Sequence, residues 1–279
     1  MSIASEITRL QNAKATLKNK LNLRNDNLHQ ITNELIDEYG NFVDSIPQGG
    51  GGLDWSEIGY NAEPQSVIDG FDYAKTIYDD WDSSQTDLSN KFKNDKNLTF
   101  MPLVDTSNGT TFSGMFQYCS KLENVPQLNT QNVQYFSQAF HSCTILKTIP
   151  ALNTSNALQI NALFYDCTAL TTVPQLDFSK AGNIASLFNN CGNLTNLGGM
   201  LNVGQAYLTS KSANFGNYTL GLSACSNLTH DSLMNVINNL YDIATKGCNT
   251  QKLVLGSTNL AKLTASEIST ATNKGWSLS

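Results

Sequence analysis

The sequence predicts an α/β repeat fold: a leucine-rich-repeat-like solenoid of 24-residue units with helical caps, preceded by an N-terminal helical module. Three observations predict it. A Phe-x-x-Cys motif recurs every 24 residues, the repeated block is poor in charge, and the flanking segments show helical patterns. Residues 1–100 hold 25 Asp, Glu, Lys and Arg, whereas residues 101–200 hold only 7. The motif begins at Phe116, Phe140, Phe164 and Phe188.

Four units, 105–128, 129–152, 153–176 and 177–200, align without a gap, and a half-unit precedes them. Equivalent apolar positions hold the same residue type from unit to unit: Cys119, Cys143, Cys167 and Cys191; Leu122, Leu146, Leu170 and Leu194. One unit of this length cannot bury its own apolar residues, whereas stacked units form a continuous core. Ungapped repetition therefore predicts stacked coils.

Within a unit, the spacing L-x-x-V-P-x-L is typical of a short extended segment, and these segments would stack about 4.8 Å apart in parallel. The spacing of Phe112 and Phe116 is typical of a helical or 3₁₀ turn. Each unit opens with a polar turn, such as that at Asp105 or Asn129. Such side chains accept a hydrogen bond from the backbone two residues on, and we also expect them to satisfy backbone groups of the neighbouring coil.

The first 47 residues form a different module. Apolar residues on a 4-3 spacing predict a heptad seam and helix association; they are Ile3, Ile7, Leu10, Leu17, Leu21, Leu28, Ile31 and Leu35. A helix folded back on another is the alternative. The glycines of 48–52 predict a flexible linker. This segment is therefore expected to serve attachment and oligomerisation.

The repeat, placed at 96–230, needs caps at both ends. We expect an N-terminal cap at 53–95, where aromatic residues fall at helical spacing. A ten-residue insertion separates the fourth unit from the next Cys-x-x-Leu, at Cys225.

The C-terminal cap is placed at 231–279. A helix is expected from Asp231 through Ile243, and a strand at 252–257. A final helix should begin at the capping box Thr264–Glu267 and end at Gly275.

The repeat units resemble the BspA-type leucine-rich repeats of bacterial surface proteins. The segment 105–122, DTSNGTTFSGMFQYCSKL, is similar almost position for position to the variant D-T-S-N…M-F-x-x-C-x-x-L. The fourth unit departs from it, because Phe178, Lys180 and Gly198 replace the usual Thr, Asn and Pro. The resemblance covers 96–230 and implies the fold without implying one ligand.

The flanks carry a second resemblance. The opening MSIASEITRLQNAKATLKNKL, the segment ELIDEYGNFVDSIP and the tail GSTNLAKLTASEISTATNKGWSL are similar to parts of bacteriophage structural and tail-associated proteins. This resemblance implies a virion component, a fibre or decoration that displays the repeat for adhesion to a host surface or glycan. Its partners would be other virion proteins and itself, as a homotrimer. A bacterial surface adhesin and a purely structural capsid or tail subunit are the alternatives.

The composition excludes several classes. A net charge of −6 without a basic patch argues against nucleic-acid binding. No stretch approaches 18 apolar residues, so membrane insertion is not expected. The N-terminus does not read as a secretory signal, so we expect synthesis in a host cytoplasm, display on the virion and reduced thiols. Without paired ligands such as C-x₂-C or a catalytic motif, we expect no metal, no cofactor and no enzyme activity.

The candidate binding face lies along the extended segments. Outward positions vary between units while their neighbours stay fixed; they are Glu123, Gln127, Lys147, Ala151, Thr171 and Gln175. Such a row of small hydrogen-bonding groups suits a glycan or a protein surface. The alternative is that these positions are simply hydrated.

Overall fold

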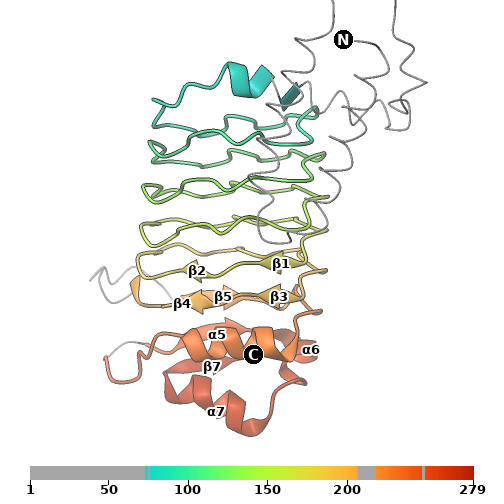
Figure 1. Cartoon of the computed structure of the whole chain (residues 1–279). Helices are drawn as coiled ribbons and strands as arrows, with labels where there is room; N and C mark the ends of the chain where they lie inside the picture. Colours follow the sequence, from blue (N-terminus) through green and yellow to red (C-terminus); the bar gives the residue numbers. More distant parts are fainter. Residues whose placement is uncertain (1–72, 75, 207–217, 247–248) are drawn as a thin grey trace, which may run out of the picture. The chain divides into compact units, whose positions relative to one another are not determined.

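A computed structural model describes residues 73–74, 76–206, 218–246 and 249–279 (Figure 1). The chain divides into two compact units, Met1–Asp80 and Trp81–Ser279. In the first unit, residues 73–74 and 76–79 are helical, as the aromatic spacing predicts. The heptad seam of 1–47 and the glycine linker of 48–52 lie outside the described residues and remain predictions.

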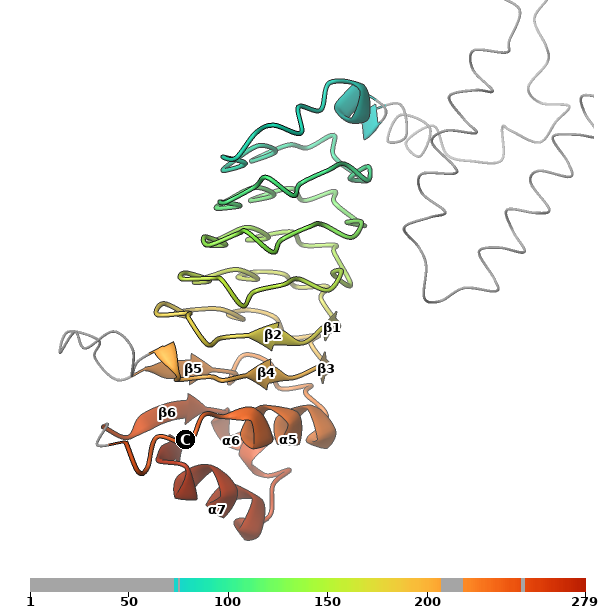
Figure 2. The ribbon, with the colours of Figure 1, turned by 60° about the vertical axis from the view of Figure 1, so that its left-hand side comes forward.

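In the second unit the chain runs in stacked turns, which Figure 2 shows from the side. Up to β4, residues of one turn pair in parallel with residues 24 positions later in the next turn, and the strands are short. Strand β1 (Thr172–Val173) pairs with β3 (Asn196–Leu197), and β2 (Leu176–Asp177) pairs with β4 (Met200–Leu201). Earlier turns join through single bridges: Asp87 to Thr111, Thr111 to Tyr135, Tyr135 to Gln159 and Gln159 to Asn183. This register supports a leucine-rich-repeat-like solenoid, which we propose as the fold class.

A column of phenylalanine rings fills the centre of the stack. Neighbouring rings lie 5.2–5.8 Å apart between centroids and within 11–13° of parallel. The column consists of Phe92, Phe116, Phe140, Phe164 and Phe188. Burial of one such ring contributes about 1.5–3 kcal/mol. A ring is buried only because the turns above and below cover it, so the core exists between units.

The turns bend through residues in the left-handed conformation, two per unit. One position holds Asn90, Gly114, Gln138, Ala162 and Ser186; the other holds Asn94, Tyr118, Ser142, Asp166 and Asn190. Around these positions, successive turns are closed by backbone hydrogen bonds from an N–H to the carbonyl three residues earlier. One such bond runs from Met115 N–H to the Phe112 carbonyl (2.9 Å). Positive φ values interrupt a helix, so 112–116 forms turns in place of the helical turn expected there.

The polar turn that opens each unit is held by side chains, as the sequence indicates. Asp105 Oδ1 accepts the Ser107 N–H at 2.9 Å. A buried threonine column then joins the turns. Thr130 Oγ1 donates to the Asn153 carbonyl (3.2 Å) and accepts the Asn153 N–H (2.7 Å), and Thr106 and Thr154 do the same one unit away. One hydroxyl thus satisfies both backbone groups of a residue in the next turn.

Pairing in the same register begins ahead of residue 96. Leu88 N–H donates to the Thr111 carbonyl at 3.0 Å, within the segment that the sequence assigns to the N-terminal cap. Trp81 stacks on Phe92, the first ring of the column, at 6.4 Å between centroids. Its Nε1 donates to the Asp105 carbonyl at 2.8 Å. Residues 81–95 therefore act as both a first turn and a cover for the column.

Beyond the fourth turn, the described residues form a parallel sheet and three helices. Their bounds are β5 Thr219–Gly221, α5 His230–Asn239, β6 Gln251–Val254, α6 Gly256–Leu260, α7 Ala265–Asn273 and β7 Trp276–Leu278. The sheet order is β5-β6-β7. The stack resumes after the insertion, because Cys225 Sγ donates to the Phe188 carbonyl at 3.5 Å, as earlier cysteines do one unit back.

The C-terminal elements agree with the sequence in kind, but two of them end earlier than expected. Helix α5 ends at Asn239 and not at Ile243, because Leu240 has an extended ψ of 134°. The capping box of Thr264 and Glu267 is present, and the left-handed Gly275 (φ 88°) follows α7. Helix α5 begins one residue before Asp231, with Thr229 as its cap. The strand expected at 252–257 is wrong at its end: it stops at Val254, because Gly256 is left-handed (φ 72°) and starts α6.

The threonine column provides a stability test. We expect Thr130→Val, which keeps the shape but removes the hydroxyl, to lower the free energy of unfolding by about 1–3 kcal/mol, because the carbonyl and N–H of Asn153 both lose the buried hydroxyl that they bond. Thr110→Val is the control, since the exposed Thr110 Oγ1 bonds only the Thr86 carbonyl (3.1 Å) and should cost under about 0.5 kcal/mol. Urea denaturation measures both. Equal losses would contradict a special role for the column.

Candidate binding surface

The six positions of the predicted binding face form two rows. The first row, which consists of Glu123, Lys147 and Thr171, lies next to fully buried leucines. Glu123 and Lys147 are exposed, whereas Thr171 is half-buried. The residue before each of them, Leu122, Leu146 and Leu170, is fully buried. Thr171 Oγ1 donates to the Lys147 carbonyl at 3.1 Å. The side chains of one row thus range from an acid and a base to a hydroxyl engaged with the backbone.

The second row contains Gln127, Ala151 and Gln175. Ala151 and Gln175 are exposed. Gln127 is half-buried, and its Nε2 donates to the Ala151 carbonyl, so this amide holds the next turn. The next position of this row is Gly199, and Gly198 stands just before it, at the position that holds proline in earlier units. A Cβ at Gly198 would lie 2.8 Å from the Gln175 backbone nitrogen. This close approach explains why glycine replaces the proline of earlier units.

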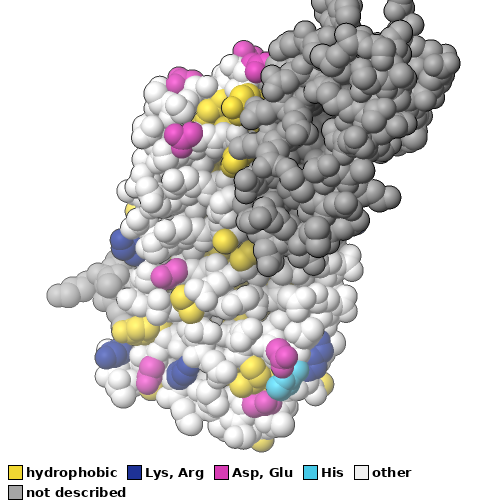
Figure 3. All heavy atoms as spheres, viewed as in Figure 1, with side chains coloured by type: hydrophobic (Ala, Val, Ile, Leu, Met, Phe, Trp, Pro, Cys, Tyr) yellow, Lys and Arg dark blue, Asp and Glu magenta, His cyan; other side chains and the backbone are white. Residues whose placement is uncertain are grey.

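The surface of the second unit is largely neutral. Figure 3 shows one face, where isolated acidic, basic and apolar side chains stand among neutral polar ones. A neutral surface rich in amides and hydroxyls favours hydrogen bonding over charge attraction. The structure therefore places all six predicted positions on adjoining turns, with Gln127 and Thr171 partly used to join those turns.

A second surface lies where the chain turns just before each cysteine, and the sequence interpretation missed it. Tyr118, His141 and Tyr165 follow one another on successive turns, with ring centroids 5.0 and 4.8 Å apart. Tyr118 is 37% exposed. We call these three residues the aromatic edge. Alignment of the units shows the signal, since a Tyr or His ring occupies one of the two positions before Cys in three consecutive units.

The surroundings of His141 favour its neutral imidazole. Its Nδ1 lies 3.0 Å from Gln117 Nε2, which can only donate, so Nδ1 accepts. Burial lowers the pKa of His141 below 6.5; nearby Lys93 adds to the shift and Asp166 opposes it. Protonation would turn Nδ1 into a donor that faces another donor.

The cysteines form a buried hydrogen-bonded column. Cys143 Sγ donates to the Phe116 carbonyl at 3.1 Å, and the other cysteines repeat this bond to the preceding turn. Burial raises the pKa of the Cys119 thiol to about 12 and that of Cys143 well above its usual value. Thiols in this state are poor nucleophiles at neutral pH, because the thiolate is the reactive form. Within the described residues, no group of three or more His, Cys, Asp or Glu is arranged to hold a metal ion.

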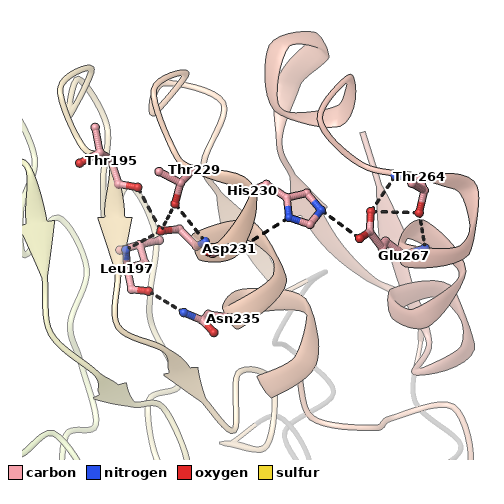
Figure 4. Close-up of polar contacts among 9 residues, drawn as sticks. Thr195, Leu197, Thr229, His230, Asp231, Asn235, Thr264 and Glu267 are labelled. Carbon is pink, nitrogen blue, oxygen red and sulfur yellow. Dashed lines mark hydrogen bonds and ion pairs between the residues drawn. The ribbon is translucent and has the colours of Figure 1, made fainter.

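A third polar cluster joins α5 to α7 (Figure 4). His230 Nε2 lies 2.9 Å from Glu267 Oε1, and its Nδ1 lies 3.6 Å from Asp231. Nearby, Ser232 Oγ donates to the Thr195 carbonyl (3.0 Å) and accepts the Leu197 N–H (3.1 Å). The serine hydroxyl is thus committed to the backbone, and His230 contacts carboxylates. This arrangement holds the helices together.

In comparison with known proteins, a family model matches the repeat. Residues 86–201 match the family model described as "Mycoplasma protein of unknown function, DUF285". No curated protein and no solved structure shows significant similarity to the chain. The match fits a BspA-like repeat protein, in agreement with the resemblance of the units, and its bounds take in the turn at Leu88. Across the described part of the chain, every helix is too short or too polar to cross a membrane.

The pKa of His141 predicts a pH-dependent stability. Because folding lowers this pKa, the unfolded chain binds more protons as the pH falls through about 6.5, and the folded state loses stability between about pH 7 and 5. In His141→Gln, this position carries the residue of the preceding unit, Gln117. We expect the melting temperature of this variant to depend less on pH over this range. Thermal unfolding of both proteins from pH 7.5 to 5.0 measures it. Equal slopes would contradict the assignment.

Proposed function

We propose that the chain is a bacteriophage virion protein, a fibre or decoration whose repeat adheres to a host surface or glycan without catalysing a reaction. One observation carries the adhesive role. Exposed positions such as Glu123 and Lys147 vary from turn to turn, while the buried leucine before each of them is constant. A rigid ladder of variable, outward side chains suits recognition of an extended partner.

The virion role rests on the resemblance of the flanking segments. The heptad pattern of 1–47 supports assembly as a homotrimer, which would display three copies of the repeat. Weak contacts from several copies add up through effective concentration, so avidity exceeds the affinity of one copy. A bacterial surface adhesin is the second candidate, and the family match over 86–201 favours it, because that match suggests a BspA-like repeat surface protein.

Adhesion is tested with the full chain on mucin-coated surfaces and on a panel of intact gut bacteria. We expect binding, and we expect Glu123→Ala combined with Lys147→Ala to weaken it about tenfold if these side chains contact the partner. Asp231→Ala combined with Lys252→Ala is the matched control, since it removes one exposed acid and one exposed base from the C-terminal elements. Failure to bind any of these surfaces would contradict the adhesive role.

The virion role is tested by quantitative mass spectrometry of purified phage particles from the source culture. We expect the chain in fixed proportion to the major capsid protein, with a copy number that separates head decorations from tail fibres. Its absence from particles, with recovery in host membrane or secreted fractions, would favour the bacterial surface adhesin.

The oligomeric state has its own measurement. Light scattering on the full chain should give a mass three times that of the 30.4 kDa chain. A monomeric mass would contradict association through the N-terminal heptads.

A further inference from the structure

The aromatic edge carries features that the stacking of turns does not require. Tyr118 occupies a left-handed position (φ 65°). The equivalent residues of other turns are Asn94, Ser142, Asp166 and Asn190. Asn and Asp tolerate this conformation, whereas a bulky aromatic residue is strained in it. Residues held in strained conformations cluster at ligand-binding and active sites.

A second unfavourable feature lies beside the first. The Gln117 side chain is 97% buried, since its exposed fraction is 3%. Its Oε1 is the buried side-chain atom, among the residues described, that lacks a hydrogen-bond partner. Its Nε2 is bonded to His141 in the middle of the aromatic edge. A buried acceptor without a partner destabilises the fold. Two destabilising features, the left-handed Tyr118 and the unpaired Gln117 Oε1, therefore lie side by side in the chain.

A carboxylate and an amide border the rings at one end, and a lysine borders them at the other. Asp166 follows Tyr165 directly, and its Oδ1 accepts a hydrogen bond from Asn190 Nδ2 at 2.6 Å. At the other end, Lys96 Nζ donates to the Tyr118 carbonyl at 2.6 Å. A carboxylate and an amide side by side offer acceptors and donors to neighbouring hydroxyl groups. The rings offer apolar surface with polar tips.

We propose that the aromatic edge, with Asp166 and Asn190 at its border, binds neutral saccharides. One face of a sugar ring presents C–H groups that pack against an aromatic ring, and its rim presents hydroxyls that a carboxylate and an amide bind. Three rings about 5 Å apart along the stack suit an extended chain of sugars. This inference rests on the proposed adhesive function and assigns it a ligand class and a second surface.

The test measures binding of the full chain to dextran, amylopectin, yeast mannan and mucin by affinity electrophoresis. We expect at least one of these to retard the chain. Tyr118→Asn and Tyr165→Asn should each weaken that binding about fivefold, the effect of one lost aromatic contact. Both variants place residues that other turns already carry, at Asn94 and Asn189, so the fold should persist. A melting temperature no lower than that of the unchanged chain confirms it.

Tyr135→Gln is the matched control. Tyr135 is also 37% exposed but lies away from the aromatic edge, and the next unit carries Gln159 at its position. Its binding should equal that of the unchanged chain. Equal losses in all three variants would overturn the proposal, as would retention of binding in Tyr118→Asn and Tyr165→Asn.

The outcomes separate this inference from the proposed function. If the chain binds bacteria but none of dextran, amylopectin, mannan and mucin retards it, and protease treatment of the bacteria abolishes binding while periodate does not, the partner is a protein and the saccharide inference fails alone. If the chain binds no surface and no polysaccharide, both fail. Periodate-sensitive binding that depends on Tyr118 supports both.

Discussion

Contact between one turn and the next is the interaction on which the rest of the structure depends. A 24-residue unit is too small to bury its own rings, and Phe140 is buried because Phe116 and Phe164 cover its two faces. Polar groups follow the same logic. The hydroxyl of Thr130 and the thiol of Cys143 each bond to backbone of a neighbouring turn. Stability therefore accumulates between units, and open ends need covers such as Trp81.

This division between inside and outside explains how the surface can vary. The interior positions are committed to the column of rings, the thiols and the threonines, whereas Glu123 and Lys147 are exposed. A change at such a position leaves the stack intact. The aromatic edge differs, because the left-handed backbone of Tyr118 and the unpaired Oε1 of Gln117 destabilise the turn that contains them. Local conflicts of this kind are expected at functional sites.

Much of the stacking could be predicted from the sequence because it repeats. The 24-residue period appears directly as the register of pairing from Thr111 to Tyr135, and the Asp105 turn and the Thr264 capping box follow from local chemistry. The bends could not be predicted, because the spacing of Phe112 and Phe116 is the same in a helix and in a left-handed turn. The aromatic edge was missed because its rings come together only when neighbouring turns are superposed.

Native-state hydrogen exchange of the full chain tests the central claim, that the turns are joined by pairing at a spacing of 24 residues. The amides of Phe112, Phe116, Phe136 and Phe140 each donate to a carbonyl of the following turn, at 2.8–3.0 Å. They should exchange slowly and as a group, through cooperative opening of adjoining turns. The amides of Ser107 and Gln131, bonded to side chains of exposed turns, should exchange faster. Fast, independent exchange at the four phenylalanines would contradict the account.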